Sequence, residues 1–172
     1  MTRIIGILVF TLIWIGLHAQ PPTTNLYLFE IDKLSDTLWA VHSPKFLSKN
    51  NEQGYNNQPQ FIGNHEILFT RQTPTGKNTE IIKLDLLAGS ESQVTNTEIS
   101  EYSPTLMPDS RHFSVVRTEL DGHQTLWKYA LDDAGTFQNL FPNFEEKIGY
   151  HSWINDTSVS YTHLTLPTIY SV

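Results

Sequence analysis

The chain of 172 residues contains no cysteine. This excludes disulfide bonds, thiolate metal sites and cysteine nucleophiles. It also excludes a lipid-anchored lipoprotein, which needs a cysteine at its mature N-terminus. Basic residues are scarce too, with 11 Lys and Arg against 18 Asp and Glu and a formal net charge of −7. An acidic chain without basic clusters is poorly suited to nucleic acid, so we expect no nucleic-acid partner.

A long apolar run occurs at the N-terminus, where residues 4–17 follow Arg3 and precede the small residue Ala19. A basic start, a short apolar core and a small residue at the exit are typical of a secretory signal peptide. We predict a signal peptide over 1–19, and hence a periplasmic or secreted bacterial protein with no membrane span after cleavage. An uncleaved anchor is the alternative, but the run is shorter than the roughly 20 residues that a span needs.

Helical periodicity is scarce in the rest of the chain. Short runs rich in β-branched and aromatic residues are separated by Gly, Pro, Asn and Asp instead. Gly76 and Gly122 stand in two of these breaks and are placed to accept a positive φ in a hairpin turn. The pattern predicts an all-β, antiparallel chain, with strands expected at 25–31, 65–70, 79–86, 112–118 and 125–131.

Several positions recur in a common order along the chain. Three tyrosines follow one another at intervals of 47 and 48 residues, and two prolines are 45 residues apart. After each tyrosine comes a large apolar residue with Asn or Asp three positions later. The recurring residues are Tyr55, Pro59, Phe61 and Asn64, then Tyr102, Pro104, Leu106 and Asp109, then Tyr150, Trp153 and Asp156.

A period near 45 residues with four short strands per unit is typical of a β-propeller blade. We expect Phe61, Leu106 and Trp153 to lie on inner strands, packed between blades. The Asn or Asp that follows each of them is expected in the next hairpin turn, bonded to nearby backbone. A β-sandwich with coincidental spacing is the alternative.

The predicted fold is therefore a partial β-propeller of about two four-stranded blades with fragments of their neighbours. The expected boundaries are a partial blade with ring-closing strands at 20–53, blades at 54–100 and 101–147, and the start of a further blade at 148–158.

The stretch YSPTLMPDSRHFSVV, residues 102–116, resembles the repeat of TolB-type, WD40-like propellers. In that repeat an apolar residue precedes Ser-Pro-Asp-Gly, and a strand, a Gly turn and a second strand follow. The resemblance covers 101–147 well and 54–100 moderately. The chain departs from it at Ser110, where the family has Gly, and at Asn64, where it has Asp. The resemblance implies an exported propeller.

Residues 159–172, VSYTHLTLPTIYSV, do not continue the repeat, because they hold no turn glycine and no acidic residue. Their letters resemble one translated frame of a transposase-based sequencing adapter. We expect this segment to be a non-native tail, with the third unit ending near Ser158.

Catalytic patterns are missing from the sequence. It contains no G-x-S-x-G nucleophile elbow and no H-E-x-x-H zinc motif, and its seven histidines are scattered. We therefore expect no catalytic residue, no metal and no cofactor. Among the tryptophans, Trp127 and Trp153 fall in strand patterns and are predicted to pack in the core, whereas Trp39 lies in an irregular region.

A propeller fold does not by itself imply an activity. The leading hypothesis is a fragment of an exported, non-catalytic TolB-like propeller that binds a protein or peptide. The alternative is the propeller of a larger enzyme, such as a prolyl-oligopeptidase-like serine peptidase, whose catalytic domain is not in this chain. A propeller joined to a peptidoglycan-binding domain is a third possibility.

Overall fold

The structure is a computed structural model that describes residues 22–163. The predicted signal peptide and most of the predicted tail lie outside the described residues. Within them the chain forms β-strands and one short 3-10 helix, η1 (Lys49–Asn51). The prediction of an all-β chain is confirmed.

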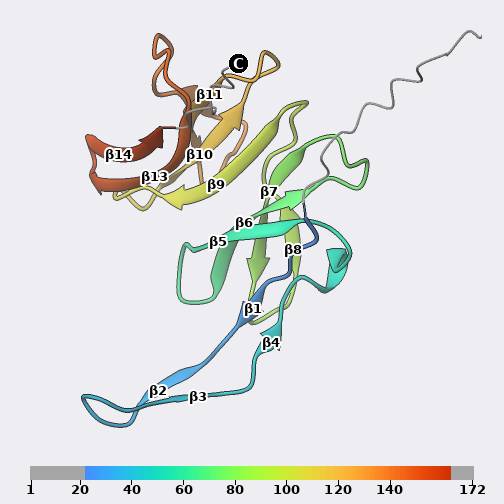
Figure 1. The fold of residues 1–172 in the computed structure, drawn as a ribbon, viewed down its shortest axis with the longest axis vertical. Coiled ribbons are helices and arrows are strands. Elements are labelled where there is room, and N and C mark those ends of the chain that lie inside the picture. Colours follow the sequence, from blue (N-terminus) through green and yellow to red (C-terminus); the bar gives the residue numbers. More distant parts are fainter. Residues whose placement is uncertain (1–21, 164–172) are drawn as a thin grey trace, which may run out of the picture.

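Two four-stranded antiparallel sheets form the body of the molecule (Figure 1). In each sheet the strands lie side by side in chain order, as expected for successive hairpins. The first sheet contains β5 (Asn56–Phe61), β6 (Glu66–Gln72), β7 (Thr79–Asp85) and β8 (Glu91–Gln93). The second contains β9 (Ser100–Leu106), β10 (His112–Thr118), β11 (Gln124–Ala130) and β12 (Phe137–Asn139).

Three strand pairs flank the two sheets. They are β1 (Tyr27–Leu28) with β4 (Lys45–Phe46), β2 (Ile31–Lys33) with β3 (Trp39–Val41), and β13 (Ile148–Asn155) with β14 (Ser158–His163). The strand expected at 25–31 is divided between β1 and β2, which have different partners. The β2–β3 hairpin projects from the body as an arm (Figure 1).

Two of the hairpin turns contain a glycine with a positive φ. Gly76, between β6 and β7, has a φ of 69°, and Gly122, between β10 and β11, has a φ of 79°. Residues with a Cβ rarely adopt this left-handed conformation, so glycine allows the chain to reverse without steric strain. The predicted positive φ at both glycines is confirmed.

Alternating side chains bury both faces of the first sheet. Leu68 and Ile81 pack against Phe113, Val115 and Tyr129 of the second sheet. The opposite face packs against Leu26, next to β1, through Ile67, Phe69, Ile82 and Leu84. Fully burying one such side chain stabilises the fold by roughly 1.5–3 kcal/mol, so neither sheet is stable in isolation.

The second sheet is covered in the same way on its far face. Val116 and Leu126 are fully buried against Ile148 of β13, with Trp153 partly buried beside them. Consecutive sheets therefore stack through three apolar layers. This is the arrangement expected of neighbouring propeller blades, which bury their faces only against each other.

A β-bulge interrupts the first strand of each four-stranded sheet at the same place. Gln58 in β5 and Ser103 in β9 have φ values of 55° and 53°, and the register with the next strand shifts beside each of them. Pro59 and Pro104 follow directly, where a missing N–H is tolerated. A bulge bends a strand and redirects its side chains, and these two bulges shape the candidate site.

Phe61, Leu106 and Trp153 differ in burial although each lies in the first strand of its unit. Leu106 and Trp153 are partly buried, but Phe61 is 51% exposed, contrary to the expectation that it packs between blades. Phe61 pairs with Ile67 and so shares the sheet face that points toward β1 and β4. Those strands are only two residues long and leave this end of the face uncovered.

Candidate binding site

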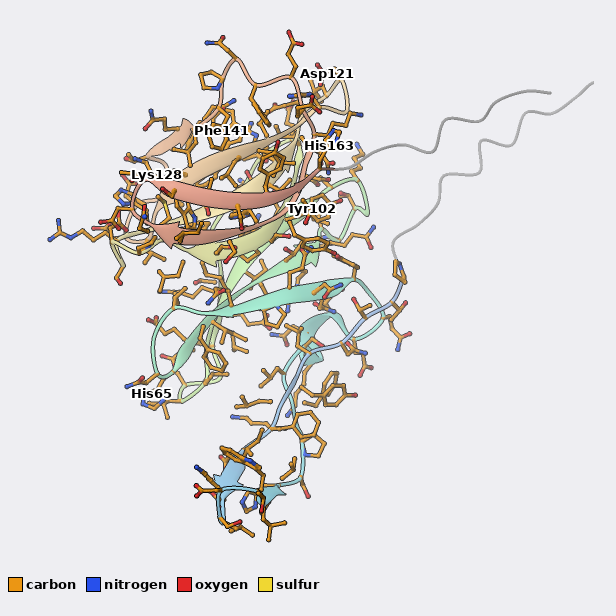
Figure 2. The ribbon with its side chains drawn as sticks, turned by 60° about the vertical axis from the view of Figure 1, so that its left-hand side comes forward. His65, Tyr102, Asp121, Lys128, Phe141 and His163 are labelled. Carbon is orange, nitrogen blue, oxygen red and sulfur yellow. The ribbon has the colours of Figure 1, made fainter. Side chains whose placement is uncertain are left out.

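A pocket of about 260 Å³ lies where the first strands of three consecutive units come together. The three repeat tyrosines, Tyr55, Tyr102 and Tyr150, all line it. Figure 2 shows Tyr102 where the two four-stranded sheets approach each other. We call this cavity the tyrosine pocket, and its other lining residues are Gln58, Ser103, Val116, Gln124 and Gly149.

The tyrosines reach the pocket from different positions relative to the bulges. Tyr102 directly precedes the bulge residue Ser103, whereas Tyr55 stands three residues before Gln58. Tyr150 comes from β13, in the unit that follows the second sheet. The sequence spacing of 47 and 48 residues identified the three tyrosines as a set, and the structure brings the set to one cavity.

The Tyr55 hydroxyl remains neutral at physiological pH. Burial raises its pKa, a hydrogen bond with Asn57 offsets part of this increase, and the neighbouring Tyr102 and Tyr150 raise the pKa further. The remaining lining side chains carry no formal charge either. The pocket therefore offers aromatic surface and neutral hydrogen-bonding groups.

Gln58 joins the two sheets below the pocket. Its Oε1 accepts hydrogen bonds from Oγ1 of Thr70, at 2.9 Å, and from the backbone N of Ser103, at 3.0 Å. These bonds fix the side chain across the sheet boundary, because one partner lies in each sheet. Gln58 was not among the residues predicted from the sequence, although its place 45 residues before Ser103, next to a repeat proline, is a signal that identifies it.

Ser103 has an unusual hydroxyl group. The residue is 9% exposed, and its Oγ is buried with no hydrogen-bond partner among the described residues. Leaving a buried polar group unpaired costs about 1–3 kcal/mol. Such a group is uncommon in native structures and calls for a specific explanation.

The turn residues of the repeat are held in different ways. Asp109 Oδ1 accepts hydrogen bonds from the backbone N of Arg111 and His112, and its Oδ2 lies 2.6 Å from His112 Nδ1. In the third unit the neighbouring residue Asn155, and not Asp156, accepts a bond from the N of Thr157.

Among the described hydrogen bonds, the first turn lacks the side-chain bonds seen in the other two. The backbone N of Ile62 donates to the carbonyl of Glu66 at 3.0 Å. Among the described hydrogen bonds there is none from the side chain of Asn64, contrary to expectation. The replacement of Asp by Asn at this position therefore coincides with a turn that uses backbone bonds alone.

Comparisons with known proteins extend these observations. No protein-family model and no curated protein matches the chain. Among solved structures it is similar to the putative TolB from Agrobacterium tumefaciens, with a TM-score of 0.60 and 14% identity over 82% of this chain and 51% of the other. It is also similar to TolB from Acinetobacter baumannii, with a TM-score of 0.49 and 17% identity over 72% of this chain and 32% of the other.

The chain has a TolB-like propeller fold. Identity of 14% shows the fold alone, so the comparison transfers no residue role. The chain spans about half the length of the Agrobacterium structure. The predicted fold class, with two four-stranded blades and parts of their neighbours, is confirmed.

A serine–histidine contact lies between the second blade and β13 of this TolB-like propeller. Ser114 Oγ is 2.7 Å from His151 Nε2 and also accepts a hydrogen bond from Trp153 Nε1 at 2.8 Å. Ser114 is fully buried, so no substrate can reach its hydroxyl. Among residues 22–163, His151 Nδ1 has no hydrogen-bond partner, so no third group there orients the imidazole as a nucleophile-activating base requires. The contact holds the two units together.

The described residues contain a bidentate ion pair but no metal-binding cluster and no membrane-spanning helix. The described residues hold no group of three or more His, Cys, Asp or Glu side chains that could bind a metal ion. Arg71 and Glu91 form a bidentate ion pair within the first blade, at 2.7 and 2.8 Å. Over residues 22–163, no helix is both long and apolar enough to cross a membrane.

Proposed function

We propose that this chain belongs to an exported, non-catalytic propeller that binds a protein or peptide partner at the tyrosine pocket. The observation that carries the proposal is the meeting of Tyr55, Tyr102 and Tyr150, from three consecutive units, around one cavity. Tyrosine is enriched at protein interfaces because its ring supplies apolar contact area and its hydroxyl supplies a hydrogen bond.

The construction of the pocket also supports binding. Its walls come from the two blades and from β13, and the inter-sheet bonds of Gln58 hold the first two walls in place. A preformed cavity with a few converging polar groups is the usual form of a recognition site. Export follows from the signal peptide predicted at 1–19, which places the proposed partner in the periplasm or outside the cell.

Site-specific photocrosslinking tests the proposal. A photoreactive phenylalanine analogue at Tyr150, which is 62% exposed at the rim, is expected to give discrete adducts in periplasmic extract of the source cell. The same analogue at His65, exposed at the far end of the first blade (Figure 2), is the matched control. Identical adducts at both positions, or none at Tyr150, would overturn the proposal.

A second variant distinguishes specific recognition at the pocket from nonspecific binding. Tyr102→Ala removes a central wall of the pocket while leaving the exposed rim position Tyr150 available for the crosslinker. The Tyr150 adducts should fall at least tenfold in this variant. Adducts that persist unchanged would place the contact outside the tyrosine pocket.

A further inference from the structure

The tyrosine pocket has no charged group to receive a charged ligand. None of its lining residues is acidic, basic or histidine. The charged residues adjacent to it in sequence, Glu101 and Arg117, are occupied on the other face of the second blade. Glu101 Oε1 accepts a hydrogen bond from Tyr129 at 2.6 Å, and the Arg117 guanidinium lies 4.4 Å from the centre of the Trp127 ring.

A carboxylate or ammonium that entered the pocket would lose water without gaining a counter-charge. Burying an unpaired charge is strongly unfavourable, whereas a neutral polar group needs only hydrogen-bond partners. The pocket therefore selects against charged side chains.

The polar groups of the pocket include both a donor and an acceptor that have no described partner. Gln58 uses Oε1 for its two structural bonds, which leaves its Nε2 as a donor. Gln124 donates from Nε2 to Thr118 Oγ1 at 3.3 Å, which leaves its Oε1 as an acceptor. The Ser103 hydroxyl is buried beneath this wall and does not reach the ligand.

We infer that the tyrosine pocket receives a primary carboxamide, the side chain of an asparagine or glutamine in a peptide partner. The ligand oxygen accepts from Gln58 Nε2, and the ligand amide donates to Gln124 Oε1. The planar amide lies against the phenol rings. This inference rests on the proposed function, because it names the side chain through which the partner is recognised.

An NMR titration of the full chain with small probes tests the inference. The probe is N-acetylglutamine methylamide, and its matched control is N-acetylglutamate methylamide, which has almost the same shape but carries a negative charge at pH 7. We expect saturable shifts of the Ser103 and Gly149 backbone amides with the glutamine probe and at least tenfold weaker binding of the glutamate probe. Equal binding of the two probes, or no shift with the glutamine probe, would overturn the inference.

Two glutamine variants localise the binding. Gln124→Leu removes the proposed acceptor and only the 3.3 Å bond to Thr118, so the folded state should be retained while glutamine-probe binding falls about tenfold. Gln138→Leu, on the exposed edge strand β12, is the control and should bind normally. Unchanged binding in Gln124→Leu would contradict the assignment of its Oε1 as the acceptor.

A third probe distinguishes a peptide ligand from a sugar. N-acetylglucosamine also carries an amide and hydroxyl groups that suit tyrosine-lined sites. Saturable binding of this sugar without binding of the glutamine probe would overturn the inference in favour of a glycan. Tyr150 crosslinks without glutamine-probe binding would overturn the inference and leave the proposed protein-binding function intact.

Discussion

The hydroxyl oxygen of Ser114 lies 2.7 Å from Nε2 of His151, which follows it by 37 residues. The same oxygen accepts a hydrogen bond from the indole of Trp153. Ser114 belongs to β10 of the second blade, whereas His151 and Trp153 belong to β13; the Ser114 hydroxyl also lies 3.4 Å from the carbonyl oxygen of Thr105 in β9. One buried hydroxyl therefore connects the second blade to the next unit through polar contacts, within an otherwise apolar layer.

Substitution Ser114→Ala should weaken this connection. The change removes the hydrogen bonds of the Ser114 hydroxyl to His151, Trp153 and Thr105 and leaves the indole N–H of Trp153 without its acceptor, which costs about 1–3 kcal/mol. The free energy of unfolding, measured by urea denaturation at pH 7, is expected to fall by that amount. Ser152→Ala, at an exposed position of β13, should change it by less than about 0.5 kcal/mol. Equal effects of the two substitutions would contradict this role of Ser114.

The stability of the chain should fall as the pH drops from 6.5 toward 4. Burial lowers the pKa of His151 from 6.5 to about 4, so the unfolded state takes up a proton in this range before the folded state does. Proton uptake by the unfolded state destabilises the fold, and a shift of this size corresponds to an effect of the order of 2 kcal/mol after allowance for partial exposure.

Denaturation curves at several pH values check the His151 contribution. His151→Gln should reduce the loss of stability between pH 6.5 and 4, whereas His65→Gln, at an exposed position, should leave it unchanged. An unaltered pH profile in His151→Gln would show that other groups cause the acid sensitivity.

The repeated features of the fold could be predicted from the sequence because they depend on local patterns. Alternating apolar residues identified the strands near β6, β7, β10 and β11, and Gly76 and Gly122 identified two of the turns between them. The arm formed by β2 and β3 was missed, since residues 25–31 have the composition of one strand. Their division between two partners depends on long-range pairing, which local propensity does not determine.

The candidate site was predictable only in part. The repeat interval singled out Tyr55, Tyr102 and Tyr150, although not that they share a cavity. Gln124 lines the same cavity but holds no repeated position, so only the stacking of the units brings it there. The Ser114–His151 contact likewise has no local sequence signal, because its partners lie in different units.

The buried carboxyl group of Glu101 should produce a pH dependence of the opposite sign. Burial raises the pKa of Glu101 above 4.5, so the folded state retains a proton that the unfolded state releases. Stability from this group is present below pH 4.5 and is lost as the pH rises through the folded-state pKa. Glu101→Gln cannot ionise and keeps an oxygen for the Tyr129 hydroxyl.

Unfolding curves measured above pH 4.5 compare the stability of Glu101→Gln with that of the unsubstituted chain. The difference in stability between Glu101→Gln and the unsubstituted chain should shift in favour of the variant as the pH rises. Glu98→Gln, at an exposed position, serves as the control and should show no such trend. A constant difference at all pH values would mean that Glu101 does not ionise in the range tested.

Ser110→Gly should stabilise the second blade. Ser110 has a φ of 54°, a conformation that is unfavourable by about 1–2 kcal/mol for residues with a Cβ. Glycine avoids this strain but loses about 0.5–1 kcal/mol through the greater freedom of the unfolded chain, so a net gain of about 0.5 kcal/mol is expected. This is also the position at which the TolB-type repeat has glycine.

Ser110→Ala is the matched control, because alanine keeps the Cβ and therefore the strain. Urea denaturation of both variants should place the midpoint of Ser110→Gly above that of Ser110→Ala. A lower midpoint for the glycine variant would mean that the turn tolerates Ser110 without strain.

Trp39 in the projecting arm should contribute little to stability, because its side chain is 55% exposed and the described cation–π contact of its ring is with Lys33 of the same hairpin. Trp39→Ser is expected to change the free energy of unfolding by less than about 0.5 kcal/mol. In the chain without residues 1–19, and so without Trp14, it should also remove most of the tryptophan fluorescence that iodide quenches, since Trp127 and Trp153 are partly buried. Trp153→Phe loses the bond to Ser114, so it should lower the free energy of unfolding. It should leave the fluorescence that iodide quenches largely unchanged. A large loss of stability in Trp39→Ser would show that the arm packs against the body instead of projecting from it.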